Sequence, residues 1–107
     1  MTSASLPRLA PTERLILELL VQRGELFGLA LVAASNGAIK RGTVYVTLGR
    51  MEDKGYLESR QEPQPEGAIG LPRRLYSPTP HALRVLEAWR AAARIFAGGA
   101  LTTEAGS

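Results

Sequence analysis

The sequence predicts a mainly α-helical fold with a small β-wing, of the winged helix-turn-helix class. Two apolar helical stretches are followed, after a short turn, by a third helix with one apolar and one polar side, which is the helix-turn-helix order. Two short alternating segments then flank a stretch rich in Pro and Gly, as in a wing, and a last long helix follows. With 107 residues, 45% apolar and 21% charged, the chain has the size and composition of one globular domain.

The composition narrows the classes of function. The chain has no cysteine, so it holds neither a disulfide nor a thiolate metal site. Its formal net charge is +3, and eleven of its thirteen basic residues are Arg, which suits contacts with phosphate and guanine. Apolar runs are too short for a membrane span and no secretion signal is recognisable, so we expect a cytoplasmic protein with no membrane partner.

The first helix is predicted to begin at Pro11, after a flexible lead, and to end before Gly24. Leu17 and Val21 lie on the side where a monomer would expose them, so we expect a second subunit to cover both. The opposite, core-facing stripe comprises Leu15, Ile16, Leu19 and Leu20.

A second helix is predicted over residues 25–35, which are apolar nearly all round, and the turn signal Asn36-Gly37 closes it. Gly28 inside this helix costs roughly 1 kcal/mol relative to Ala, which indicates that a neighbouring element approaches it closely.

The third helix begins after Gly42, stops at Gly55 and carries the predicted DNA-reading surface. Val44, Leu48 and Met51 share the side that faces the core. Beside them runs a stripe of hydrogen-bond donors, whose N-terminal members can touch a ligand lying across the start of the helix. A polar face that meets only solvent is the alternative. The predicted DNA contacts in this region are Lys40, Arg41, Thr43, Tyr45, Val46, Thr47 and Arg50.

The wing is predicted from residues 56–61 and 73–77, which alternate as antiparallel strands do. The segment between them is too long for a tight hairpin. Arg60, Arg73 and Arg74 are expected to cluster at the base of the wing. They are either plain surface charges or contacts to a DNA backbone beside the third helix.

Thr79 and Pro80 predict a sharp helix start, and this fourth helix is expected to run to about Phe96 and to stop at Gly98-Gly99. Apolar residues recur along one side at spacings of four and three, which is typical of a seam that packs on a second surface. That surface is either the domain's own first helix or a second copy of the chain, and we favour a homodimer. The predicted dimer interface comprises Leu17, Val21, Ala82, Leu86, Trp89, Ala93 and Phe96.

Several segments together resemble the PadR family of winged-helix transcriptional regulators. The likeness spans about residues 12 to 90, and the short C-terminal region resembles the single-helix subgroup, which dimerises through its last helix. It implies a homodimeric repressor that binds an inverted repeat in double-stranded DNA, relieved in some members by a small molecule. The residues that carry the resemblance are Glu13-Arg14-Leu15-Ile16-Leu17-Glu18-Leu19-Leu20, Phe27-Gly28, Gly42-Thr43-Val44-Tyr45, then Leu48, Arg50, Met51, Glu52 and Gly55, and Arg73-Arg74-Leu75-Tyr76-Ser77-Pro78-Thr79.

Three positions depart from the family pattern. Phe27 stands where an aromatic with a hydroxyl is common, Val46 where proline is frequent, and Ala82 where glycine is frequent. Trp89 resembles an interface tryptophan that stacks flat aromatic drugs in one member of the family. It is therefore the candidate contact for a small aromatic or hydrophobic effector, with plain core packing as the alternative.

On this basis the chain divides into a flexible lead at residues 1–10, a winged helix-turn-helix DNA-binding domain at 11–78, a dimerisation helix at 79–97 and a disordered tail at 98–107. We predict no enzyme, cofactor, catalytic residue or metal site, because the chain has no catalytic or nucleotide-binding pattern and its one histidine, His81, has no partner in sequence. A winged-helix module that binds protein instead of DNA, and an enzyme subunit, are the competing classes.

Overall fold

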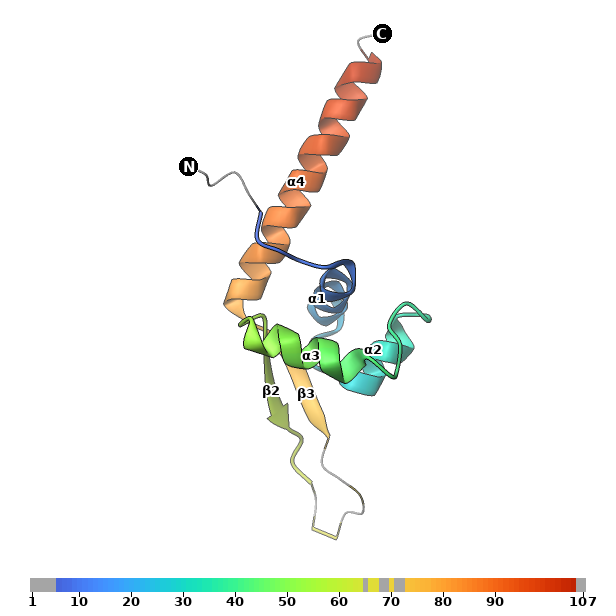
Figure 1. Cartoon of the computed structure of the whole chain (residues 1–107), viewed down its shortest axis with the longest axis vertical. Coiled ribbons are helices and arrows are strands. Elements are labelled where there is room, and N and C mark those ends of the chain that lie inside the picture. Colours follow the sequence, from blue (N-terminus) through green and yellow to red (C-terminus); the bar gives the residue numbers. More distant parts are fainter. Residues whose placement is uncertain (1–5, 65, 68–69, 71–72, 106–107) are drawn as a thin grey trace.

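The computed structural model describes residues 6–64, 66–67, 70 and 73–105, and for residues 96–105 it describes the backbone alone. Within these residues the chain forms four helices and a three-stranded antiparallel sheet, which confirms the predicted mainly α fold with a β-wing. In Figure 1 the first three helices lie together in the middle, the wing extends to one end and α4 to the other. In chain order the elements are α1 (Pro11–Arg23), β1 (Leu26–Phe27), α2 (Gly28–Ala34), α3 (Val44–Asp53), β2 (Leu57–Gln61), β3 (Arg74–Pro78) and α4 (Pro80–Ala105).

Helix α1 supplies the centre of the core. Glu13 accepts a hydrogen bond from the Ala10 N–H at 2.9 Å at its start, and Gly24, at a φ of 83°, ends it. Leu17 is fully buried, so the expectation that it awaits a second subunit is wrong. The reason is that α1 contacts α2, β3 and α4 of its own chain, and these cover more than one side of it. Val21 remains 42% exposed.

The segment after α1 differs from the prediction of one continuous helix. Leu26 and Phe27 form a short strand, β1, which pairs with Tyr76 and Leu75 of β3, so the sheet has the order β1-β3-β2. Helix α2 starts only at Gly28. A short apolar run is too short for its periodicity to distinguish a strand from a helix. Here the edge of β3 offers hydrogen-bond partners to the backbone of Leu26 and Phe27, so these residues form a strand.

The turn between α2 and α3 follows the prediction. Asn36 and Gly37 both have positive φ, at 53° and 91°, as an Asn-Gly turn requires. The Ser35 hydroxyl donates to the Val32 carbonyl at 2.8 Å and accepts the Ile39 N–H at 2.9 Å. These two bonds fix the path of the chain, and Ile39, 2% exposed, anchors it in the core.

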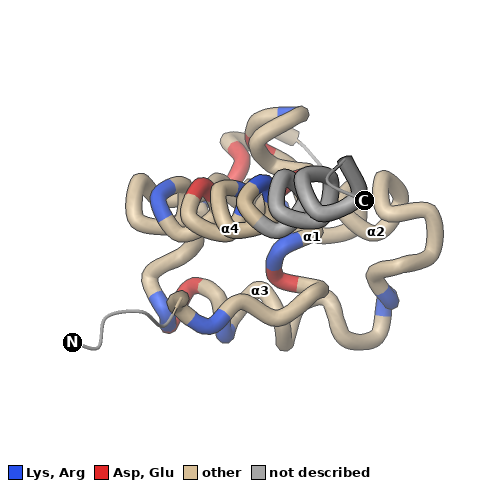
Figure 2. The backbone as a smooth tube through the Cα atoms, turned by 90° about the horizontal axis from the view of Figure 1, so that it is seen from above, with Lys and Arg blue, Asp and Glu red and all other residues tan. Residues whose placement is uncertain are grey.

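Helix α3 confirms the predicted apolar side, because Val44, Leu48 and Met51 are each 0% exposed. Gly55, at a φ of 79°, ends the helix and turns the chain into β2. In the view from above, α3 lies along one side of the molecule, while α4 overlaps α1 (Figure 2). The side of α3 opposite its buried residues is therefore left open.

The wing strands pair in a single register, with Ser59 opposite Tyr76 and Gln61 opposite Arg74. Residues opposite one another project to the same face of a sheet, and neighbours along a strand alternate. The face that carries Tyr76, 6% exposed, and Leu57, 4% exposed, packs on the core. The other face carries Arg60.

Helix α4 begins as predicted, with the Thr79 hydroxyl accepting the Ala82 N–H at 3.1 Å. Ala82 and Leu86 are at most 1% exposed within their own domain, so their assignment to a dimer interface is corrected to the core. The helix also passes through Gly98-Gly99, where we expected it to stop, and continues to Ala105. Figure 1 shows its C-terminal half projecting beyond the other elements.

The described part of the N-terminal lead is packed on the domain. Leu9 is 8% exposed, the Arg8 carbonyl accepts the Tyr56 hydroxyl at 3.0 Å, and the Pro7 carbonyl accepts the Trp89 indole N–H at 2.9 Å. Residues 6–10 are thus tied to the turn that follows α3 and to α4. Among the described residues, none of the helices combines the length and the apolar character needed to cross a membrane.

Candidate nucleic-acid interface

The open side of α3 brings together most of the predicted reading residues. Tyr45 and Val46 are 53% and 57% exposed, Arg50 is exposed and Thr47 is half-buried. Thr43 occupies the N-cap position with an exposed side chain. These five residues therefore lie on the sides of α3 that its buried residues, Val44, Leu48 and Met51, leave uncovered.

Positive charge gathers where α3 begins. Lys40 and Arg41 are exposed in the preceding turn, and the Lys40 carbonyl accepts the Val44 N–H at 3.0 Å, which holds this turn against the helix start. Among the described residues, Lys40, Arg41 and Arg50 form no ion pair. The charges of Lys40 and Arg41 add to the partial positive charge of the helix N-terminus, and Arg50 extends this anion-attracting surface to the last turn of α3.

The donor stripe predicted beside the apolar side of α3 consists of Thr43, Thr47, Arg50 and Lys54, and Lys54 at its far end makes an ion pair within the fold. Its ammonium lies 2.6 Å from Oε2 of Glu13, whose side chain is 6% exposed. This contact ties the end of α3 to the start of α1. Lys54 is thus held by the fold, and whether Thr43, Thr47 and Arg50 touch a ligand stays a prediction.

The three wing arginines do not form the single cluster that the sequence predicted. Arg60 lies on the face opposite Tyr76 and holds Glu25 with two hydrogen bonds, of 3.0 Å and 2.7 Å. Those bonds lower the pKa of Glu25 and raise the pKa of Arg60, so each charged group favours the charged form of the other. Because strand residues alternate, Arg74 projects to the other face, where its Nε donates to Ser59 at 3.1 Å.

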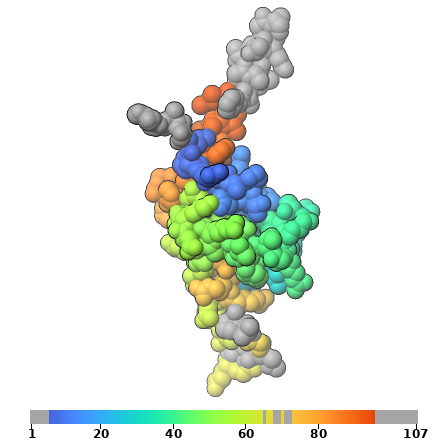
Figure 3. Space-filling model, viewed as in Figure 1, coloured from blue at the N-terminus to red at the C-terminus, as the bar shows by residue number. Residues whose placement is uncertain are grey.

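Arg73 lies next to the edge strand β1. Its guanidinium stands 4.2 Å from the centroid of the Phe27 ring, a cation–π contact, and its Nε lies 3.3 Å from Glu62. A hollow of about 530 Å³ opens beside it, lined by residues of β1, α2, α3 and β3 that include Tyr45, Arg73, Arg74 and Tyr76. Figure 3 shows α3, in green, directly above β3, in orange, on one face of the molecule. The start of the reading helix and the wing thus border the same depression.

The surface predicted for dimerisation is divided by the structure. Trp89 is half-buried, and with Leu9, Leu15 and Glu18 it lines a second hollow of about 540 Å³ between α1 and α4. Ala93 is exposed, as is the neighbouring Ile95 at 73%. The side chain of Phe96 lies outside the described residues.

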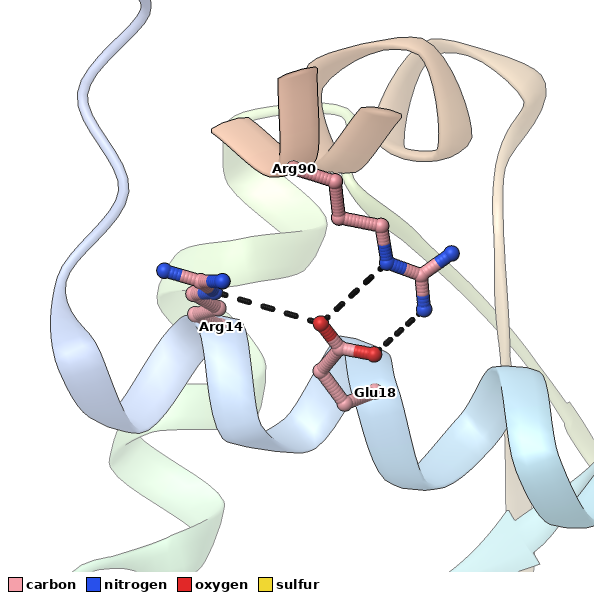
Figure 4. Close-up of polar contacts among 3 residues, drawn as sticks. All are labelled: Arg14, Glu18 and Arg90. Carbon is pink, nitrogen blue, oxygen red and sulfur yellow. Dashed lines mark hydrogen bonds and ion pairs between the residues drawn. The ribbon is translucent and has the colours of Figure 1, made fainter. Parts of the chain in front are cut away.

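An ion-pair cluster fixes how α4 docks on α1. Arg90 of α4 donates two hydrogen bonds to the Glu18 carboxylate, and Arg14 lies 3.9 Å from the same carboxylate (Figure 4). By helical spacing, Arg90 lies beside the predicted apolar seam of α4 and not within it, so the sequence alone assigns it no special role. The sequence did not indicate this contact, because the partner comes from a distant segment.

Two further contacts escaped sequence reasoning. Glu13 stands three residues after Ala10, the spacing of a capping box, and that signal could have marked it as more than a surface charge. Glu25, which binds Arg60, carried no comparable signal, because the pairing depends on the strand register.

The comparisons with known proteins agree with this architecture. A sequence model described as "Transcriptional regulator PadR-like family" matches residues 16–88. Comparison with curated proteins found no match. A PadR family transcriptional regulator from Eggerthella lenta is 28% identical, with a TM-score of 0.63 over 86% of this chain and 82% of that one.

Two solved structures at lower identity share the fold. A PadR-like regulator from Bacillus cereus is 21% identical, with a TM-score of 0.63 over 90% of this chain and 93% of that one. Bacillus subtilis PadR, solved in complex with operator DNA, is 19% identical, with a TM-score of 0.62 over 77% of this chain and 48% of that one.

Proposed function

Because the chain belongs to the PadR-like family of transcriptional regulators, we propose that it is a homodimeric repressor that binds an inverted-repeat operator in double-stranded DNA. DNA-binding regulation is the family's function, and the repressor role, the homodimer and the inverted-repeat operator are our proposals. The observation that carries the proposal is the open side of α3. On it Thr43 and Arg50 are exposed and Thr47 is half-buried, and among the described residues Arg50 forms no ion pair. The side facing the core, with Val44, Leu48 and Met51, is fully buried.

The proposed mode of binding places α3 in the major groove by its N-terminal half. Lys40 and Arg41 anchor the helix start on phosphate. Arg50 is long enough to reach the two acceptors of a guanine, and the methyl groups of Val46 and Thr47 meet a thymine methyl. The operator complex of Bacillus subtilis PadR, which has the same fold, supports DNA as the partner.

The wing supplies the second set of contacts. Arg73 and Arg74 border the hollow beside α3, so they are placed to meet the DNA backbone next to the groove that α3 enters. Arg60 is left out of this set, because it does not line that hollow and lies with Glu25 on the face of the sheet opposite Arg74. These contacts position the protein without reading base identity.

Dimerisation is assigned to the part of α4 that the domain leaves open. Ala93 and Ile95 are exposed on the projecting helix, and a second copy would bury them. A two-fold dimer presents two α3 helices, whose half-sites lie about one helical turn apart. We further assign a small aromatic or hydrophobic effector to the hollow beside Trp89, and a cytoplasmic location, where the DNA is.

The test is selection of bound fragments from the host genome, followed by titration of the selected operator and a scrambled duplex at several salt concentrations. We expect tight binding to the operator and weaker, strongly salt-dependent binding to the scrambled duplex. Absence of salt-dependent binding to either duplex would instead favour a winged-helix module that binds protein.

A further inference from the structure

Gly28 packs directly beneath the ring of Tyr45. A Cβ atom built on Gly28 would lie 2.6 Å from Cε1, 2.8 Å from Cζ and 3.0 Å from the hydroxyl oxygen of Tyr45. Among the glycines whose surroundings the structure describes, each of the others has open space at this position. Its φ lies outside the left-handed region, so its backbone would accept any residue. A side chain at position 28 would therefore fit only if the exposed Tyr45 ring moved away.

The consequence falls on a side chain of the proposed DNA surface. Tyr45 belongs to the first turn of α3, is 53% exposed and borders the same hollow as Arg73 and Arg74. The contacts that a Cβ atom would make are with the outer end of the Tyr45 side chain, so relieving them requires the ring to swing away and to carry its hydroxyl with it. A side chain at position 28 would therefore redirect the Tyr45 hydroxyl.

We propose that Gly28 is a positioning residue for DNA binding: by having no side chain, it lets the Tyr45 phenol lie across the junction of β1 and α2, beside the wing arginines. There the hydroxyl donates a hydrogen bond to the same stretch of phosphate backbone that Arg73 and Arg74 contact. This inference rests on the proposed DNA-binding function. It joins the reading helix and the wing into one backbone-binding surface, whose geometry is set by a residue that touches no DNA.

The phenol is neutral, and this gives its contact with phosphate a distinct signature. Removal of an arginine that binds phosphate reduces the number of counterions released and so lowers the salt slope of binding. Removal of the Tyr45 hydroxyl should weaken binding at every salt concentration and leave that slope unchanged. A general defect of folding would instead lower the fraction of active protein and the melting temperature.

The experiment is a double-mutant cycle on operator DNA with wild type, Gly28→Ala, Tyr45→Ala and the double variant, measured by fluorescence anisotropy. We expect Gly28→Ala and Tyr45→Ala each to weaken binding on the order of tenfold, and the double variant to bind as Tyr45→Ala does within about twofold, as coupled neighbours do. Tyr45→Phe should match Tyr45→Ala, because the hydroxyl makes the contact. If Gly28→Ala weakens binding equally in both Tyr45 backgrounds, or not at all, the positioning role is overturned.

A measurement without DNA separates this inference from the proposed function. The Tyr45 ring should shift the NMR resonances of the Gly28 α-protons by its ring current, and Tyr45→Ala should abolish that shift. Unchanged α-proton resonances in Tyr45→Ala would overturn the contact itself. Salt-dependent binding by the wild type tests the proposed function alone, so its failure is distinct from a failure of the cycle.

Discussion

The ammonium of Lys54 lies 2.6 Å from Oε2 of Glu13, joining the C-terminal end of α3 to the first turn of α1. Glu13 also accepts the Ala10 N–H at Oε1, so each oxygen of this nearly buried carboxylate has one partner. Lys54→Met should leave Glu13 short of a partner and lower the free energy of unfolding by about 1 to 2 kcal/mol, less than for a fully buried pair because Lys54 is partly exposed.

Urea unfolding measures that decrease. The matched control is Arg94→Met, which breaks an ion pair with Glu87 whose two side chains are 66% and 61% exposed and should change stability little. Operator binding by folded Lys54→Met should equal that of wild type. An equal effect of the two substitutions on stability would show that the Glu13 contact is no more than a surface pair.

Arg50→Ala tests whether α3 reads sequence. Removal of a bidentate contact to guanine should cost about 1 to 3 kcal/mol per half-site on the operator and relax the preference at one base position. Binding to a scrambled duplex should fall much less. Arg84→Ala, which removes an exposed arginine from α4, is the control and should alter neither affinity. Equal decreases on both duplexes after Arg50→Ala would mean that Arg50 contacts only phosphate.

The wing arginines should separate into two kinds. Arg74→Ala should weaken binding to operator and scrambled duplex alike and lower the salt slope by roughly 1 for each phosphate that a protomer no longer binds. Arg60→Ala should leave the slope unchanged, since Glu25 already neutralises that guanidinium on the opposite face. A lowered slope for Arg60→Ala would place DNA on the face of the wing that we assign to solvent.

Dimerisation through α4 predicts the effect of charges on its exposed apolar residues. Ala93→Glu with Ile95→Glu should convert a dimer to a monomer in sedimentation at micromolar concentration, because burial of unpaired carboxylates is costly. Both residues are exposed within their own chain, so the fold should survive. Leu29→Glu, at an apolar residue of α2 that is 44% exposed, should remain dimeric. A dimeric Ala93/Ile95 variant would move the interface elsewhere.

Tyr76 should make stability fall at alkaline pH. Burial raises the pKa of Tyr76, and the charge of Glu52 raises it further. The neutral phenol is thus favoured in the fold, so its contribution to stability is complete below the unfolded-state pKa of about 10 and is lost as the pH rises from there through the folded-state value. Tyr76→Phe should flatten the decline in urea-unfolding free energy above that pH.

Much of the helical framework could be predicted because its signals are local. The buried side of α3, the Thr79 cap and the glycine stops at Gly24 and Gly55 depend on residues within one or two turns of each other. The open side of α3 followed from the same periodicity. Which of its residues touch DNA stays a prediction.

The parts that could not be predicted depend on distant segments. Strand β1 exists because Leu26 and Phe27 meet β3, which lies far along the chain. A helical wheel shows that Leu17 lies apart from Leu15 and Leu19, but it does not show how many neighbours surround the helix, and here they cover it. The separation of Arg60 from Arg74 follows from the strand register, which the long segment between the strands does not fix.

The strand order of the sheet also disfavours edge-to-edge pairing between copies of the chain. The most apolar of the wing strands, β3, lies in the middle, and its two flanks are a two-residue strand, β1, and the polar strand β2, which carries Glu58 and Arg60. Very short or charged edge strands are poor templates for pairing with another sheet. The sheet therefore offers few exposed backbone edges on which pairing between copies, and hence a fibril, could start.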